Sequence, residues 1–443
     1  MQEPVDLLIC NGLIITQDEK HQIFYETDLA VNNGQIIAIG KDLTYQTNHK
    51  IDAHRKAVMP GFVDSHMHET LTRGVCEDLP LNRWLDEICF PLDRSHTYET
   101  IYAAALMNQL EMIRGGITTF IDIYRFPAAC AEVAMRSGLR GIFVPQIMIS
   151  PSDVGESIES SEKFVSDWKG RSPLITPGFG PHAPYSLPPE SYSKIGALAE
   201  KYDVPIHTHL SETQWEVGLI RDQFGCTSTE MLQRAGVLSP RLSVAHGVYL
   251  SDQDVRLLVE HGVGLAYNPS SNTKMAAGIA RIPDYLAAGL KVGLGTDSNL
   301  SNNNLDMFEE MRIGAFLQKL TRNDATIMPV QTMLDLATRN SASILGLENI
   351  AGSLEIGKQA DIILIDLDQP HLWPIVEGAR QNIEEQIVYS ANASDVSHTI
   401  VAGKILMSDR KVLTLDMEEA FLRVQEQTAY LLKKLGRPNS EKS

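Results

Sequence analysis

Residues 63–74 read VDSHMHETLTRG, an apolar run that ends in two histidines, His66 and His68, one residue apart. In an extended strand, residues two apart project to the same side. The stretch therefore predicts a β-strand that carries two imidazoles side by side. With 13 histidines in 443 residues, chance alone gives roughly 0.4 such pairs. The pair is thus either a product of chance or half of a metal site, and the rest of the chain must decide.

Seven further apolar runs follow, and helix-like stretches separate them. They are ITTFIDI near residue 117, GIFVPQI near 141, LITPGFG near 174, VPIHTHL near 204, RLSVAHG near 241, GVGLAYN near 262 and KVGLGTD near 291. Strands that alternate with helices are typical of βα units around a parallel sheet. Eight strands over roughly 250–300 residues predict an α/β fold, a (β/α)8 TIM barrel with its active site at the carboxyl ends of the strands.

The two ends of the chain have a different pattern of predicted secondary structure. Residues 1–58 and 351–415 contain short apolar β segments, and Asn-Gly pairs in the first of them are hairpin signals. We expect these flanks to form the two parts of one small β-sandwich domain beside a barrel at 59–350. Residues 416–443 predict a C-terminal helix and tail.

Composition narrows the classes of partner. Hydrophobic residues make up 43% and charged residues 21%, and the net charge is −18. An acidic surface repels phosphate backbones and anionic lipid, so we expect no nucleic-acid or membrane partner. Five cysteines, Cys76 among them, are scattered singly without a CxxC pair, which favours reduced thiols. The N-terminus lacks the basic segment of a signal peptide, and we expect a cytoplasmic protein.

Polar residues of chemical interest gather at the carboxyl ends of the predicted strands. They are His66, His68, His182, His207, His209, His246 and Asp297. A histidine alone is as often a core side chain bonded to a carbonyl as it is a ligand. Five such strand ends, however, predict one shared site. Imidazoles and a carboxylate without thiolates are ligands for Zn²⁺ or a similar ion rather than Ca²⁺ or Mg²⁺.

Glu212 lies three residues after His209, close enough to exchange a proton with a water on the same metal. A bound Zn²⁺ lowers the pKa of that water from about 15.7 to about 7. The alternative for Glu212 is a carboxylate that stabilises a helix N-terminus.

These stretches resemble the amidohydrolase superfamily over nearly the whole chain. The matching motifs are PGFVDSHMH, RGVCEDLPLNRWL, GITTFIDI, GPHAPYSLPPE, PIHTHLSET, VAHGVYL, YNPSSNTKMAAGIA, GLGTDSNLSNNNLDMFEEMR and GSLEIGKQADIILIDL. Within the superfamily they are similar to 5′-methylthioadenosine/S-adenosylhomocysteine deaminases and to the related s-triazine hydrolases.

The resemblance implies one divalent metal, zinc first, with Fe²⁺ or Mn²⁺ as alternatives. Its ligands would be His66, His68, His209 and Asp297. The fourth strand ends without a lysine, so no bridging carbamate for a second metal is expected.

The resemblance also assigns roles around the metal. Glu212 would carry a proton to the ring nitrogen and to the leaving ammonia, and His246 would orient the attacking water. Asp297 would accept the proton of that water. His182 matches a substrate-contacting histidine. Trp84 lies where it could line the pocket or merely pack at its rim.

Three departures from the deaminase pattern bear on the substrate. The segment from His68 to TRG is shorter than in the family. Asp93 stands where the family has a substrate-binding glutamate. The third-strand region GIFVPQIMISPSDVGES has no arginine for an amino-acid carboxylate, so such a tail would lack its bidentate partner.

We therefore predict a hydrolytic aminohydrolase that acts on a small-molecule, amino-substituted N-heterocycle, with 5′-methylthioadenosine, S-adenosylhomocysteine or a related adenosine first. The same site could act on another ring: an s-triazine, by loss of an amine or of chloride, guanine or an oxidised purine, or a pterin. The alternative that is not an enzyme is a barrel that serves as a non-catalytic scaffold. The resemblance further implies a homodimer or a larger homo-oligomer.

Overall fold

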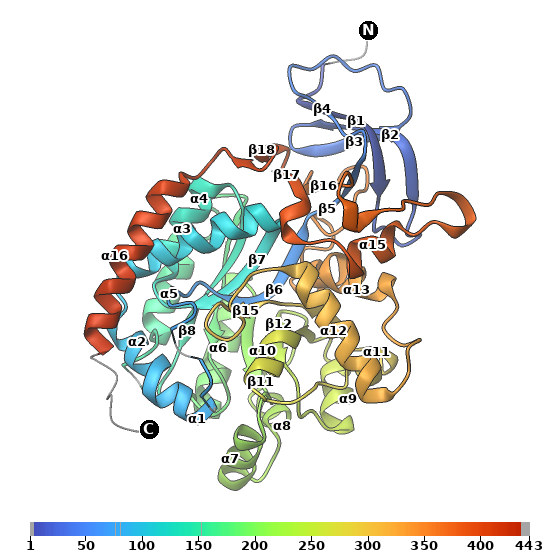
Figure 1. Ribbon diagram of the computed structural model, residues 1–443. Coiled ribbons are helices and arrows are strands. Elements are labelled where there is room, and N and C mark those ends of the chain that lie inside the picture. The colour runs from blue at the N-terminus through green and yellow to red at the C-terminus, as the bar shows by residue number, and fades with distance from the viewer. Residues whose placement is uncertain (1–3, 76, 80, 152, 436–443) are drawn as a thin grey trace.

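The computed structural model describes residues 4–75, 77–79, 81–151 and 153–435 (Figure 1). Cys76 and the predicted tail after residue 435 lie outside the described residues. No helix in the described part of the chain combines the length and apolar character that crossing a bilayer requires.

The two flanks of the chain meet in one mixed sheet. Its strands are β1 (Leu7–Ile15), β2 (Ile23–Asn32), β3 (Gln35–Gly40), β4 (Lys50–Asp52), β5 (Lys56–Pro60), β16 (Ile362–Asp366), β17 (Val396–Val401), β18 (Lys404–Ser408) and β19 (Lys411–Val412). Strand β16 pairs antiparallel with β5 and so joins the two flanks. Asn33 and Gly34 both have positive φ, 50° and 75°, as a two-residue hairpin turn requires. The sequence predicts a small β-sandwich formed by the two flanks, and the hydrogen bonds join their strands in one connected sheet.

The central part of the chain forms a set of parallel strands. They are β6 (Phe62–His68), β7 (Ile117–Tyr124), β8 (Arg140–Ile147), β9 (Ile175–Pro177), β10 (Gly180–Pro181), β11 (Ile206–Leu210), β12 (Leu242–His246), β13 (Gly264–Tyr267), β14 (Lys291–Leu294) and β15 (Asp297–Ser298). One sheet has the order β10-β8-β7-β6-β15, with β9 beside β8, and the other has the order β11-β12-β13-β14. Each of the eight predicted apolar runs coincides with one of these strands or with a close pair of them.

Helices lie around these strands and beside the flank sheet (Figure 1). They are α1 (Leu81–Trp84), η1 (Leu85–Cys89), α2 (Phe90–Ser95), α3 (Tyr98–Gly115), α4 (Pro127–Ser137), α5 (Ile158–Trp168), α6 (Pro189–Tyr202), α7 (Gln214–Phe224), α8 (Ser228–Arg234), α9 (Asp252–Glu260), α10 (Pro269–Lys274), α11 (Ile282–Ala287), α12 (Met307–Arg322), α13 (Val330–Ala337), α14 (Arg339–Ile344), α15 (Ile383–Tyr389) and α16 (Met417–Leu435). Short 3₁₀ turns span Pro370–Leu372, Gly378–Arg380 and Ala393–Asp395. The predicted C-terminal helix is α16, which packs along α3.

A buried ion pair fastens the flank sheet to the parallel strands. Arg140, the first residue of β8, donates from Nε and Nη2 to the carboxylate of Asp361, at 2.9 and 3.2 Å. Their side chains are 6% and 1% exposed. The pair lies at the amino end of β8, and the polar residues singled out in the sequence lie at the opposite ends of the strands.

Candidate active site

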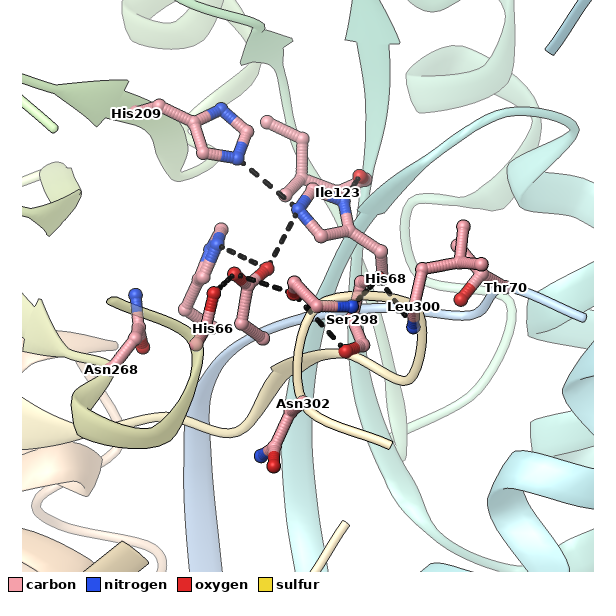
Figure 2. Close-up of polar contacts among 12 residues, drawn as sticks. His66, His68, Thr70, Ile123, His209, Asn268, Ser298, Leu300 and Asn302 are labelled. Carbon is pink, nitrogen blue, oxygen red and sulfur yellow. Dashed lines mark hydrogen bonds and ion pairs between the residues drawn. The ribbon is translucent and has the colours of Figure 1, made fainter. Parts of the chain in front are cut away.

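Four side chains from three strand ends converge on one point. The Nε2 atoms of His66 and His68 lie 3.4 and 3.3 Å from Oδ1 of Asp297. Strand β11 brings His209, whose Nε2 is 3.2 Å from Nε2 of His68 (Figure 2). The convergence follows from topology, because β15 pairs in parallel with β6 and places Asp297 beside Met67. The structure thus brings together all four residues that the sequence predicts as metal ligands.

Backbone carbonyls fix how these rings are turned. Nδ1 of His68 lies 2.5 Å from the carbonyl oxygen of Ile123, and Nδ1 of His209 lies 2.6 Å from that of His182. Because a carbonyl only accepts, each ring must carry its proton on Nδ1, which leaves a lone pair on Nε2. The inward-facing atoms are therefore donors to a cation.

The inward-facing atoms need a positive partner. Nε2 of His66 is buried and has no hydrogen-bond partner among the described residues, and the Nε2 lone pairs of His68 and His209 face each other at 3.2 Å. Burial lowers the pKa of His66 to about 3 and that of His209 well below its ordinary value, whereas the contacts of His68 with Asp297 outweigh burial and raise its pKa. A divalent metal fits this set of three imidazoles and one carboxylate.

Asp297 is held by groups on its other side. Ser271 and Ser301 donate their hydroxyls to Oδ2, which leaves Oδ1 toward the histidines. Asp297 has φ 60° and His246 has φ 74°. This left-handed conformation is costly for residues other than glycine and persists where the surrounding structure enforces it.

His246 and Glu212 face each other beside this cluster. Nε2 of His246 is 3.9 Å from Oε2 of Glu212. The side-chain amides of Asn272 and Asn268 donate to Nδ1 of His246 at 2.9 and 3.3 Å, so the ring proton lies on Nε2 and points toward the cleft. Burial raises the pKa of Glu212 above its ordinary value, which favours a carboxyl group that holds a proton.

The alternative for Glu212, a carboxylate at a helix N-terminus, falls to a different residue. Helix α7 begins at Gln214, and Glu216 accepts the backbone amides of Ser211 and Glu212 at 2.9 Å each. The side chain of Glu212 is thereby left free and lines the cleft.

The other three predicted substrate contacts line the same cleft as Glu212. They are His182, Asp93 and Trp84. Oδ1 of Asp93 accepts the hydroxyl of Tyr124 at 2.8 Å, and burial raises the pKa of Asp93 to about 6. Trp84 is 9% exposed, so it is both a wall of the cleft and part of the packing beneath it.

Several residues at the site received no role from the sequence. His207 is fully buried, with Nε2 at 2.8 Å from Nδ1 of His66 and Nδ1 at 2.7 Å from the hydroxyl of Ser243. Its place two residues before His209 on β11 was the available signal, because both then share a face of the strand. Nothing in the local sequence marks Tyr124, which reaches Asp93 from β7.

Comparison with known proteins places the chain in a family. The sequence profile of the Amidohydrolase family matches residues 57–406, which is most of the chain. The protein belongs to this family. It is 39% identical over 409 residues to the 5-methylthioadenosine/S-adenosylhomocysteine deaminase of Desulforudis audaxviator, covering 91% of this chain and 94% of that one.

Two further proteins extend the comparison. A 5′-deoxyadenosine deaminase of Methanosarcina mazei is 36% identical over 436 residues, covering 97% of this chain and 99% of that one. Among solved structures, an adenosine deaminase from Xanthomonas campestris with bound zinc superposes with a TM-score of 0.92 at 30% identity, covering 97% of this chain and 99% of the other. The predicted family is confirmed.

Proposed function

We propose that the protein is a metal-dependent hydrolytic deaminase that replaces the 6-amino group of an adenosine-type nucleoside with oxygen and releases ammonia. The observation that carries the proposal is the convergence of His66, His68, His209 and Asp297, with Glu212 beside them. A hydrolytic enzyme acting on C–N bonds of N-heterocycles is what the family and the deaminase names of its relatives support.

Those four residues would hold the ion, which we propose to be zinc, as in the similar adenosine deaminase. When bound, such an ion supplies a Lewis acid that makes a water molecule acidic near neutral pH. His66 would then donate from Nδ1 to His207, because its Nε2 lone pair is engaged. The donors of His68 and His209 are already fixed by carbonyls.

The chain's own residues account for the proton movements. The Nε2–H of His246 donates to the oxygen of the attacking water and aims it at the ring carbon that bears the amino group. Asp297 accepts one proton from this water through Oδ1, and protonated Glu212 gives its proton to the adjacent ring nitrogen. The new C–O bond is complete when the C–N bond to the amino group breaks. The proton held by Asp297 leaves with the ammonia, and the second proton of the water, which the new hydroxyl group carries, returns to Glu212 as the ring carbonyl forms.

We also infer that the parallel strands close into one (β/α)8 barrel. Phe179 and Ile206 form a parallel bridge between the two sheets on one side, and only Gly295 and Thr296 separate β14 from β15 on the other. The divisions at residues 58, 350 and 415 stay predictions. A homodimer or larger assembly is supported by apolar side chains that α16 exposes, Phe421 and Leu422 among them.

An ammonia-release assay on metal-replete protein tests the proposal. The panel holds adenosine, 5′-deoxyadenosine, 5′-methylthioadenosine, guanine, a pterin, an amino-s-triazine and a chloro-s-triazine. Ammonia from the adenine nucleosides supports the proposal. Product only from guanine, the pterin or a triazine would replace it with one of those activities. A metal content well below one ion per chain, with no product at all, would favour a non-catalytic scaffold.

A further inference from the structure

The cleft opens outward through a passage with apolar walls. Six residues line both the inner cleft and the wider opening outside it, and one of them is Thr213. The other five are apolar or aromatic, and we call them the vestibule: Leu85, Phe90, Tyr185, Trp215 and Met275. They come from η1, α2, the loop before α6, α7 and the residue after α10. A ligand whose reacting ring lies at the metal cluster must therefore pass its distal substituent along these side chains.

One wall of the vestibule is a row of aromatic rings that begins at the metal cluster. The ring of His182 meets Tyr185 edge-on, with centroids 5.6 Å apart, and Tyr185 meets Trp215 in the same manner at 5.2 Å. Trp215 remains 52% exposed although it is a large apolar side chain. An exposed tryptophan that continues an aromatic wall offers contact area to the apolar part of a ligand.

The ionisable residues along this path are mostly acidic. Asp93 and Glu212 are among the residues that line the inner cleft, and Asp78 and Asp86 are among those that line the opening. Among the described lining residues, Lys274 is the one lysine or arginine. Its ammonium is already engaged by Glu77 at 2.6 Å and by the carbonyl oxygen of Leu300 at 3.0 Å.

The two arginines whose charges act on Asp93 are not among the described lining residues of the cleft. Arg125 donates to the backbone carbonyl of Asp93 rather than lining the cleft. Arg94 pairs with Asp153 at 2.6 Å. No guanidinium among the described residues of the cleft is therefore free to form the two parallel hydrogen bonds that hold a carboxylate.

We propose that the vestibule selects the 5′ substituent of the nucleoside: it accepts an uncharged apolar group, such as a methyl thioether, and excludes a chain that ends in a carboxylate. The inference rests on the proposed deaminase function. A carboxylate in the vestibule would lose water without gaining a cationic partner and would face Asp78 and Asp86. A methyl thioether would instead bury apolar surface against Trp215 and Phe90.

The test is a matched series of 5′-thioethers of adenosine assayed for ammonia release. The series carries a methyl group, the zwitterionic chain of S-adenosylhomocysteine, or a 2-carboxyethyl group on sulfur. We expect kcat/KM for the methyl compound to exceed that for both carboxylates by about 100-fold, because a charge-assisted hydrogen bond is missing and the carboxylate is desolvated. Equal kcat/KM across the series overturns this inference alone. Ammonia from none of them, nor from adenosine, removes the proposed function and the inference together.

Two variants sharpen the test. Asp86→Arg places a cation at the opening, and we expect the ratio of kcat/KM for the carboxyethyl compound to that for the methyl compound to rise about tenfold, from the Coulomb energy in a partly solvated site. Glu200→Arg on α6 makes the same change of charge at an exposed position that does not line the cleft, and it should leave both rates as they are. An equal change of the ratio in both variants would assign the effect to net charge and overturn the vestibule as its cause.

Discussion

Replacing His207 tests whether metal binding depends on a residue that is not itself a proposed ligand of the metal. In the folded chain His207 is 0% exposed and stands between His66 and Ser243, at 2.8 and 2.7 Å. His207→Leu removes the acceptor for Nδ1–H of His66 and fills most of the same space with an apolar side chain. The ring of His66 then loses the contact that fixes its proton and its orientation.

The size of the effect can be estimated in two ways. Removing a hydrogen-bond partner of a metal-binding histidine lowers metal affinity by about 10–100-fold, which corresponds to about 1.4–2.8 kcal/mol. A buried donor left without an acceptor costs about 1–3 kcal/mol. The two ranges agree, and because His66 lies at 0% exposure, no solvent can replace the lost acceptor. We expect a loss in zinc affinity near the middle of this range.

The assay is zinc binding to chelator-stripped protein in competition with a chromophoric chelator. His207→Gln is the matched control, because its side-chain oxygen can accept from Nδ1–H of His66 and should recover most of the affinity. Circular dichroism establishes that each variant folds. Unchanged zinc affinity in folded His207→Leu would refute the reasoning. Equal losses in the leucine and glutamine variants would show that the imidazole acts by filling space.

Three other perturbations probe separate parts of the molecule. Glu212→Gln should lower kcat/KM by about 10²–10⁴-fold with metal content unchanged, because Glu212 lies outside the ligand set; a drop under tenfold in an ammonia assay contradicts its role. Arg140→Ala should destabilise the fold by about 3–5 kcal/mol, since it leaves Asp361 buried without its partner; denaturant unfolding measures this, and an unchanged midpoint contradicts it. Burial raises the pKa of Glu310 to about 8, so between about pH 4.5 and 8 the unfolded chain loses a proton that the folded chain keeps, and the free energy of unfolding falls as pH rises. Glu310→Gln should flatten this fall in thermal unfolding measured from pH 5 to 8, whereas parallel curves would exclude Glu310 as its source.

The strands could be predicted from the sequence because they depend on short-range patterns, whereas the set of metal ligands came from the resemblance to a family. A parallel strand that is buried on both faces is a continuous apolar run, and His66, His68, His209 and Asp297 lie at or near the carboxyl ends of three such runs. The only sign in the sequence that the two flanks join was that both contain short apolar β segments. Their assembly into one sheet depends on the pairing of β5 with β16, about 300 residues apart, which no local pattern specifies.

What the sequence could not give are the contacts that tune the cluster. Tyr124 ends β7 like any apolar strand residue, and only the packing of α2 against it brings Asp93 within 2.8 Å. The different roles of two neighbouring glutamates are also set by tertiary structure. Glu212 and Glu216 are four residues apart on the same short segment, and only the path of the backbone before α7 shows that Glu216 takes the amides and Glu212 takes the cleft.

The geometry of the cluster arises from the strands before any ion is considered. The rings of His68 and His209 are turned by carbonyl oxygens of Ile123 and His182, which follow the neighbouring strands in register. Asp297 is turned by two serine hydroxyls, in a backbone conformation that only the surrounding packing enforces. Oδ1 of Asp297 and the Nε2 atoms of His68 and His209 are therefore aimed at one point by the chain itself. A cation that enters is bound without turning these side chains, because their hydrogen-bond partners already orient them.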